Sequence, residues 1–458
     1  MYIEQLYTNC LAEAAYYIES NGEAAIIDPL RETEPYIELA TKRGARIKYV
    51  FETHFHADFV SGHIDLARKV NAPIVYGPLA NTNYEVINAK DGQEFRIGHL
   101  TIRVLHTPGH TPESSCYLLL DENRKEHAIF TGDTLFVGDV GRPDLLDGVM
   151  SREELAGMLY DSLQNKIKTL PDSVIVYPAH GPGSACGKNI GKETFSTIGE
   201  QRKFNYALKD QPKNAFVEEL TTGILPPPQY FFEDARINKE GYEDIDTVID
   251  RNSKPLSSAA VQKLIDKGVT ILDTRSADEF EKGFIPGSIN IGLNGQFAVW
   301  VGTLIQIDQP LVLVTSPGKE RESVLRLARV GYEQVEGFLD GGMASWKGEV
   351  DKVKSIKAEQ MNDFDHTVEV LDVRKPGEWN ISHLKDAKFV PLADMPGNLD
   401  SFDKNSTYIV HCGGGYRSMT AISLMKREGF TDLVNVYGGF GAMVNAGLKI
   451  VTEELIAD

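Results

Sequence analysis

Residues 53–59 read Thr-His-Phe-His-Ala-Asp-Phe and continue from a β-forming run at 47–53. Val60-Ser61-Gly62 then leads into a helical pattern over 63–70. Two imidazoles and a carboxylate at alternating positions on such a strand-to-helix turn can converge on one metal ion. The turn after this strand is therefore a candidate metal site.

The residues around this turn alternate between strand-like and helix-like patterns. Strands are predicted at 24–28, 47–53, 100–106, 115–120, 128–131 and 174–177, and helices at 34–43, 63–70, 152–163 and 195–208. Such alternation implies layered α/β structure. Several of these strands end directly in His or Asp, where an α/β scaffold displays its chemistry.

Further candidate ligands follow later strands in order along the chain. His110 lies in Thr-Pro-Gly-His-Thr (107–111), Asp133 in Thr-Gly-Asp-Thr (131–134), and His180 in Tyr-Pro-Ala-His-Gly (177–181). The alternative is that these are loop or core histidines of no functional importance. Because four of only 11 histidines fall in this ordered set, we favour a metal site.

This set resembles the metallo-β-lactamase superfamily, an αββα sandwich, over about residues 1–220. In its two-metal members, the residues matching His54, His56, His110 and Asp133 form one metal site. Those matching Asp58, the next residue and His180 form the second. Here the next residue is Phe59, which cannot ligate a metal, so the pattern disfavours a two-metal hydrolase.

The remaining groups resemble the mononuclear non-haem iron site of persulfide dioxygenases. The resemblance implies one Fe(II) per chain on His54, His110 and Asp133, with zinc as the alternative metal. Two imidazoles and one carboxylate leave positions open for substrate and oxygen. His56, Asp58 and His180 would then orient the ligands or bound water.

Two loops near this set are candidates for substrate contact. The segment 138–144 resembles the Gly-Arg-x-Asp segment of the dioxygenases, which implies that Arg142 binds a substrate carboxylate; the alternative is a structural arginine. The loop after His180 is rich in glycine, where glutathione-dependent dioxygenases continue with acidic and aromatic residues. It also contains Cys186, either a substrate contact or a small buried hydrophobe. The thiol carrier therefore stays open.

The second half of the chain contains a duplication. Three consecutive prolines at 226–228 suggest a linker over 226–252, which ends a first domain at 1–225. Beyond it, Ile-Leu-Asp-Thr-Arg at 271–275 recurs as Val-Leu-Asp-Val-Arg at 370–374, 99 positions later. We expect two small parallel α/β domains, at 253–350 and 351–458.

The last domain contains a candidate nucleophile. A strand at 408–411 runs into Cys412-Gly413-Gly414-Gly415-Tyr416-Arg417-Ser418, followed by a helical pattern at 419–427. Glycines let backbone N–H groups turn toward the cysteine sulfur, and the helix start adds positive potential, so the thiolate is favoured. Arg417 can bind an anion. The alternative is a buried structural cysteine.

This segment resembles the six-residue active loop of the rhodanese sulfurtransferases. The resemblance implies that Cys412 carries a persulfide and that Arg417 takes part in catalysis. It also implies substrate contacts from the rest of the loop: Gly413, Gly414, Gly415, Tyr416 and Ser418. The earlier copy has Ser316 and Arg321 at the matching places. Since a hydroxyl without an adjacent base cannot hold transferable sulfur, we expect the earlier domain to be inactive.

Composition limits the remaining possibilities. The chain has 458 residues and a formal net charge of −19, which disfavours nucleic acid and anionic membranes as partners. It shows neither an apolar run of membrane-spanning length nor a signal-peptide pattern. We expect a cytoplasmic homo-oligomer. Its four cysteines include no CxxC pair that would indicate a zinc ribbon or disulfide framework.

The domain order resembles the bacterial multidomain persulfide dioxygenase–sulfurtransferases. The resemblance implies oxidation of a low-molecular-weight thiol persulfide by O2 to sulfite and thiol, and transfer of sulfane sulfur through Cys412 to sulfite, which gives thiosulfate. One alternative is a thioester hydrolase of the hydroxyacylglutathione type with an appended sulfurtransferase. Another is a non-enzymatic sulfur relay or persulfide sensor. Metal content distinguishes the three.

Overall fold

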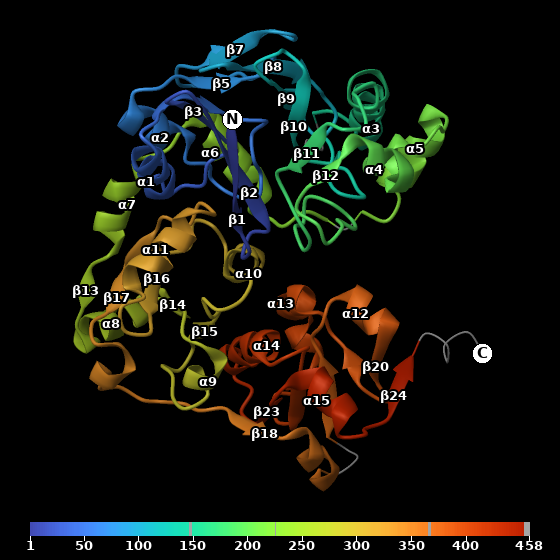
Figure 1. Cartoon of the computed structure of the whole chain (residues 1–458). Helices are drawn as coiled ribbons and strands as arrows, with labels where there is room; N and C mark the ends of the chain where they lie inside the picture. Colours follow the sequence, from blue (N-terminus) through green and yellow to red (C-terminus); the bar gives the residue numbers. More distant parts are fainter. Residues whose placement is uncertain (146–148, 225, 365–367, 453–458) are drawn as a thin grey trace. The chain divides into compact units, whose positions relative to one another are not determined.

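A computed structural model describes residues 1–145, 149–224, 226–364 and 368–452. It separates into two compact units (Figure 1). Unit 1 comprises Met1–Val248 together with Ala328–Gly331, and unit 2 comprises the rest of the described chain from Ile249 onward. Among the described residues, none of the helices has the length and apolar character needed to span a bilayer.

Unit 1 is built on two six-stranded sheets. The first has the order β1 (Tyr2–Thr8), β2 (Glu13–Ser20), β3 (Glu23–Ile27), β4 (Arg46–Phe51), β5 (Ile74–Tyr76), β6 (Ile87–Asn88). The second has the order β12 (Ser196–Thr197), β11 (Ile175–Pro178), β10 (Glu126–Gly132), β9 (Ser115–Leu120), β8 (Leu100–His106), β7 (Glu94–Ile97). A buried cluster draws aromatic residues from both sheets, including Phe51, Phe95, Tyr117 and Phe130.

Helices cover both outer faces of this sandwich. Helices α1 (Glu34–Arg43) and α2 (His63–Val70) pack on the first sheet, where Tyr36 and Leu66 join its core. Helices α3 (Arg152–Ser162), α4 (Ile198–Phe204) and α5 (Lys213–Thr221) contribute Leu159, Ile198 and Phe216 to the core of the second sheet. Figure 1 shows the two helix groups beside the blue and the green strands. The expected αββα fold is confirmed.

The candidate ligands follow strands whose directions agree. Strands β10 and β11 are parallel, and β8 is antiparallel to β9, which is antiparallel to β10. Strands β8, β10 and β11 therefore end at the same edge of the second sheet. His110, Asp133 and His180 lie in the loops that leave these ends, and the 53–59 turn follows β4 of the first sheet.

The region expected to be a linker, 226–252, is largely helical. It contains α6 (Phe231–Glu240) and α7 (Ile245–Asn252), and unit 1 extends through Val248. Phe231 and Asn238 of α6 are fully buried. Helix α5 ends at Thr221, before the prolines, and the residues after the prolines have buried side chains that hold new helices against unit 1. Leu225, in the same proline-rich stretch, lies outside the described residues.

Unit 2 contains two five-stranded parallel sheets of the same topology. The first has the order β13 (Pro255–Leu256), β17 (Val335–Leu339), β16 (Leu311–Val314), β14 (Thr270–Asp273), β15 (Ile289–Asn290). The second has the order β18 (Lys354–Ile356), β23 (Leu433–Val436), β22 (Tyr408–His411), β19 (Glu369–Asp372), β21 (Lys388–Phe389). Strands β20 (Ser382–Leu384) and β24 (Ile450–Thr452) form a separate antiparallel pair. The identical strand order confirms the duplication.

Matching helices surround the two sheets. The first copy has α8 (Ser258–Ile265), α9 (Ala277–Phe280), α10 (Phe297–Leu304) and α11 (Glu320–Ala328). The second has α12 (Pro376–Ile381), α13 (Met395–Asn398), α14 (Tyr416–Arg427) and α15 (Gly439–Asn445). Helix α14 begins three residues before the predicted 419. The loop from Cys412 therefore lies between the end of β22 and the start of α14.

The repeated Asp-x-Arg motif has a structural role in both copies. Arg275 donates to Asp273 and to the carbonyl of Gly283, 3.0 Å away. Arg374 makes the equivalent contacts with Asp372 and with the carbonyl of Ser382, 2.8 Å away. Each buried pair joins the end of a central strand to the chain that follows it.

Candidate metal centre and cysteine loop

Three of the predicted ligands converge in the interior of unit 1. Ligand atoms of His54, His110 and Asp133 all lie within 4.8 Å of one another, and the three residues are buried. Asp133 Oδ2 is 3.4 Å from Nε2 of His110 and 3.9 Å from Nε2 of His54. Side chains separated by 79 positions in the sequence thus meet at one point.

The hydrogen bonds around these ligands leave the inner atoms available for a metal. His110 Nδ1 bonds to the carbonyl of Arg142 at 2.8 Å, and His54 Nδ1 bonds to Thr53 Oγ1 at 2.9 Å. His110 Nε2 and both Asp133 oxygens are buried and have no hydrogen-bond partner among the described residues. Burial also lowers the pKa of His54, which keeps its ring neutral. These features fit a bound cation.

Glycines bring the ligand loops close together. A Cβ on Gly132, where φ is +51°, would lie 2.6 Å from Thr53 Oγ1. A Cβ on Gly141 would lie 2.3 Å from the carbonyl oxygen of Asp133. Any larger residue at either place would push the ligand loops apart.

His180 and Asp58 lie beside the first three ligands. His180 Nε2 is 3.5 Å from both Asp58 Oδ2 and Asp133 Oδ1. His56, Asp58 and His180 also form a group of potential ligand atoms within 4.8 Å of one another. The buried Phe59 ring packs on His56, with centroids 4.4 Å apart. A hydrocarbon ring therefore follows Asp58 where two-metal members of the superfamily have a ligand.

His56 pairs with two carboxylates that sequence analysis did not single out. Its Nε2 is 3.2 Å from Asp28 Oδ1 and 3.5 Å from Glu52 Oε2. Although burial acts in the opposite direction, these carboxylates raise the pKa of His56 to about 9. The predicted strand at 24–28 ends in Asp28, in the same way that other strands end in ligands, so a signal for Asp28 was present. Glu52 had no such signal.

Arg142 is held within its own segment. Its Nε and Nη2 donate to the two oxygens of Asp144 at 2.6 and 2.7 Å, and Nη1 donates to the carbonyl of Ala185 at 3.2 Å. The carbonyl of Arg142 in turn receives the His110 hydrogen bond. Arg142 thus supports a ligand, and its contact with substrate stays a prediction.

Cys186, in the loop that the sequence placed near the predicted metal set, lies beside two of its residues. Its sulfur is within 4.8 Å of ligand atoms of Asp133 and His180. Burial raises the pKa of this thiol well above its ordinary value, which favours the neutral form. No motif spacing pointed to this approach.

In unit 2, the loop after β22 surrounds a buried thiol. The N–H of Gly415 donates to Cys412 Sγ at 3.1 Å, and the Cys412 thiol donates to Ser418 Oγ at 3.6 Å. Ser418 itself donates to Asn435 Oδ1 at 2.8 Å. Gly415 is the N-cap of α14 with φ +106°, so the sulfur lies at the positive end of a helix, as expected for an activated cysteine.

Arg417 lies over the same loop. Its Nη2 donates to Glu378 Oε1 at 2.8 Å and is 3.2 Å from the position of a Cβ on Gly413. This carboxylate orients the guanidinium above the loop. The predicted loop residues are thus brought together around Cys412, and their contacts with substrate stay a prediction.

The matching loop of the first copy has different chemistry. Ser316 Oγ donates to Glu279 Oε2 at 3.1 Å, and Glu279 also receives the N–H of Ser276. Glu279 occupies the motif position of Glu378. The hydroxyl in this copy is therefore held by a carboxylate, where the second copy has a thiol that accepts the N–H of Gly415.

Comparison with known proteins agrees with this organisation. Residues 8–180 match the family model of the metallo-beta-lactamase superfamily. Residues 257–349 and 354–446 each match the family model of the rhodanese-like domain. A crystal structure of a metallo-beta-lactamase from Staphylococcus aureus subsp. aureus COL superposes with a TM-score of 0.65 at 32% identity. It covers 74% of this chain and 98% of that chain.

Two kinds of curated relative match the first part of the chain. The persulfide dioxygenase ETHE1, mitochondrial, of Homo sapiens is 32% identical over 210 residues, 45% of this chain and 74% of that protein. A hydroxyacylglutathione hydrolase of Francisella tularensis subsp. novicida is 32% identical over 228 residues, 47% of this chain and 83% of that protein. The chain belongs to the metallo-β-lactamase superfamily, with persulfide dioxygenases among its homologues, and it continues into two rhodanese-like domains.

Proposed function

We propose that unit 1 oxidises the terminal sulfur of a low-molecular-weight thiol persulfide: RSSH + O2 + H2O gives RSH, SO3²⁻ and two protons. The observation that carries this proposal is the group of three potential ligands, together with Phe59 at the place of a second-site ligand. His54, His110 and Asp133 offer two imidazoles and one carboxylate to a single metal ion, while a hydrocarbon ring follows Asp58. The persulfide dioxygenase relatives support the same chemistry.

His54, His110 and Asp133 would hold an iron(II) ion, which would supply open coordination positions for persulfide and oxygen. The chain's own residues keep this site ordered and dry. The hydrogen bonds of Thr53 and Arg142 fix the two ligand rings, and burial excludes bulk water. Asp58 and His180 are available to hydrogen-bond substrate or the water consumed in the reaction.

Cys412 performs the second step. Its thiolate attacks the sulfane sulfur of a further RSSH, so a Cys–S–S bond forms, the RS–S bond breaks, and the thiol RSH leaves. Sulfite then attacks the outer sulfur, giving thiosulfate and regenerating the thiolate. The N–H of Gly415 and the guanidinium of Arg417 lie where they stabilise the anions of both steps.

The direct test is metal analysis of anaerobically purified protein combined with oxygen uptake. We expect about one iron per chain and uptake on adding glutathione persulfide or coenzyme A persulfide. Cys412→Ser should keep oxygen uptake but accumulate sulfite in place of thiosulfate, and His110→Ala should lose uptake. Iron-loaded protein that consumes no oxygen with any persulfide contradicts the dioxygenase. Unchanged thiosulfate formation in Cys412→Ser contradicts the transferase.

A second candidate is a thioester hydrolase of the hydroxyacylglutathione type. Two observations favour it: the 32% identical hydrolase relative and the second group of potential ligand atoms on His56, Asp58 and His180. Zinc in the purified protein, with hydrolysis of an acylglutathione and no oxygen uptake, would establish this activity. Protein without metal that still transfers sulfur through Cys412 would indicate the sulfur relay.

A further inference from the structure

One face of α14 lies along the domain that contains Ser316. We call residues 253–350 the Ser316 domain and residues 351–458 the Cys412 domain; both belong to unit 2. Tyr416, the first residue of α14, donates its hydroxyl to the carbonyl of Gly292 at 2.8 Å. Ser423 accepts the N–H of Asn290 at 2.9 Å, and Arg427 donates to the carbonyl of Gly287 at 3.1 Å. Positions 416, 423 and 427 share one helix face.

The Tyr416 ring lies in a space that glycine alone provides. A Cβ on Gly295 would be 2.5 Å from Tyr416 Cε2 and 2.6 Å from Cζ. A Cβ on Gly292 would be 3.4 Å from the same Cε2. Gly295 does not have a positive φ. The constraint there is therefore room for the ring and not backbone conformation. We call Gly292 and Gly295 the glycine pair.

Tyr416 connects this contact to the thiol. It directly follows Gly415, whose N–H donates to Cys412 Sγ at 3.1 Å. A shift of the ring would move the first turn of α14 and with it that N–H. Because reactions at a positioned nucleophile are sensitive to displacements of about 1 Å, the ring contact bears on the reactivity of Cys412.

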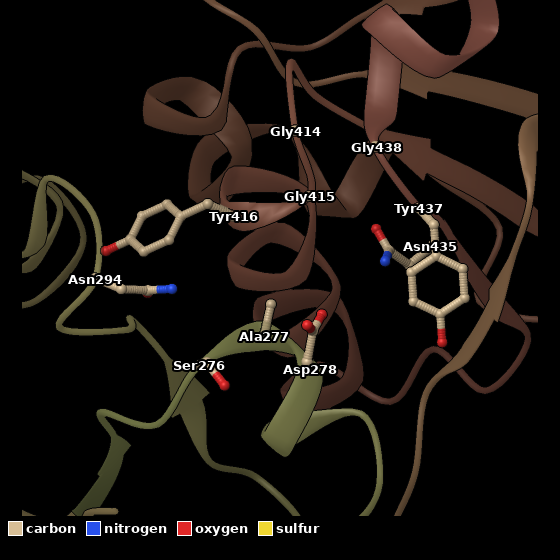
Figure 2. A pocket seen from close by; sticks show the side chains of 10 residues that line it. All are labelled: Ser276, Ala277, Asp278, Asn294, Gly414, Gly415, Tyr416, Asn435, Tyr437 and Gly438. Carbon is tan, nitrogen blue, oxygen red and sulfur yellow. The ribbon is translucent and has the colours of Figure 1, made fainter.

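A cavity beside the loop is lined by both domains. Its volume is about 360 Å³, with Ser276, Asp278 and Asn294 from the Ser316 domain and Gly414, Tyr416 and Tyr437 from the Cys412 domain. Figure 2 shows the Tyr416 ring next to Asn294 of the Ser316 domain, with Gly414 and Gly415 on the same ribbon as Tyr416. The Ser316 domain therefore reaches the surroundings of the Cys412 loop.

We infer that the Ser316 domain positions the Cys412 loop, and that Gly295 and Tyr416 are the positioning residues through which it acts. The inference rests on the proposed sulfur transfer at Cys412. It gives a physical role to a domain that lacks the nucleophile. This role is to hold the Tyr416 ring against the glycine pair, so that the N–H of Gly415 stays directed at Cys412 Sγ.

A double-mutant cycle tests this inference in the full-length protein. Gly295→Val inserts a side chain into the space of the Tyr416 ring, and Tyr416→Ala removes the ring. We expect Gly295→Val to lower kcat for thiosulfate formation from persulfide and sulfite about tenfold. In the Tyr416→Ala background, Gly295→Val should have little further effect, because the ring through which it acts is gone.

The matched control is Gly397→Ala in α13, where a Cβ meets nothing within 4 Å. It should retain wild-type kcat. Oxygen uptake by unit 1 should be unchanged in all variants. Additive losses for Gly295→Val and Tyr416→Ala, or a Gly295→Val protein with wild-type kcat, would overturn the inference.

A second readout needs no sulfur substrate. The rate of Cys412 alkylation by iodoacetamide, measured against pH, reports how strongly the loop favours the thiolate. We expect the midpoint of this profile to move to higher pH in Gly295→Val and to stay in place in Gly397→Ala. An unchanged midpoint in Gly295→Val overturns the inference. A shifted midpoint in a protein whose wild type forms no thiosulfate instead contradicts the proposed function alone.

Discussion

At the scale of single residues, Thr53 links a buried carboxylate to His54, a predicted metal ligand. Its hydroxyl donates to Asp28 Oδ2 and accepts from His54 Nδ1, each at 2.9 Å. Thr53→Val removes both bonds while keeping the branched side chain. Because partners of this kind fix the ligand ring and its tautomer, we expect iron affinity to fall roughly 10- to 100-fold. Competition with a chelator of known affinity measures the change.

The control for this substitution is Thr41→Val. Thr41 lies on α1, and its exposed hydroxyl bonds to the carbonyl of Ile37. Its loss should leave iron affinity unchanged. If Thr53→Val also binds iron as tightly as the wild type, the hydrogen-bond chain from Asp28 has no part in metal binding.

His411, next to Cys412, makes stability depend on pH. Burial lowers its pKa from 6.5 to about 4. Between these values the unfolded chain binds a proton that the folded chain does not. Stability is therefore unaffected above about pH 6.5 and falls as the pH drops toward 4, by on the order of 3 kcal/mol. Urea unfolding of unit 2 across this range measures the slope.

His411→Thr isolates this contribution, since Thr315 occupies the matching place in the other copy. The variant loses packing at every pH, so its absolute stability is not the test. Its stability should decrease less than that of the wild type between pH 6.5 and 4. Parallel curves for the two proteins would show that His411 does not cause the acid loss.

At the scale of elements, the bounds of helices and strands could be predicted from the sequence best where the local signal was strong. Helices α1 and α2 begin and end at the predicted residues 34, 43, 63 and 70, because turn residues and apolar spacing mark both ends. The predicted ligands after β8, β10 and β11 were found because each strand ends one to four residues before its ligand. Strand β2, by contrast, was not predicted, although it contains the β-forming run Tyr16-Tyr17-Ile18.

Contacts between residues far apart in the sequence could not be predicted, for a different reason. The side chain of Asn238 bonds to the carbonyls of His56 and Phe59, both at 2.8 Å, across about 180 positions. Nothing in the local composition of α6 signals such a partner. The same holds for the Tyr416 ring and Gly295, since only the assembled domains show which side chain fills the space beside a glycine.

Helix α6 therefore supports the turn at residues 53–62, which contains the predicted ligand His54. Asn238 also accepts the N–H of Ser61 at 2.9 Å, so one buried amide satisfies three backbone groups of the turn. Asn238→Ala leaves these groups without partners and should destabilise the turn by about 2 to 4 kcal/mol. Hydrogen exchange of a peptide spanning 56–62 should become faster. Lys239→Ala, at an exposed position on the same helix, should leave exchange unchanged; equal exchange in both variants contradicts the role of Asn238.

At the scale of the whole molecule, the chain joins a proposed source of sulfite to a proposed acceptor site for it. In the proposed reaction, sulfite released by unit 1 is the acceptor for the sulfur on Cys412. Two sites on one chain meet at an effective concentration that does not fall when the protein is diluted. Two sites on separate molecules have no such fixed effective concentration. The fusion should therefore increase the capture of sulfite by Cys412 most in dilute solution.

Two single-site variants separate the activities without shortening the chain. His110→Ala retains Cys412, and Cys412→Ser retains the metal site, so an equimolar mixture has one complete set of sites on two molecules. At nanomolar protein with persulfide and oxygen, we expect a sulfite-trapping reagent to capture roughly two- to fivefold more sulfite from the mixture than from wild type at equal site concentration. The difference should vanish at micromolar protein, where sulfite reaches any Cys412 quickly. If the mixture and the wild type release equal amounts of sulfite to the trap at both protein concentrations, sulfite equilibrates with the solvent before it reacts. The fusion would then ensure that the two activities are produced together, without coupling them kinetically.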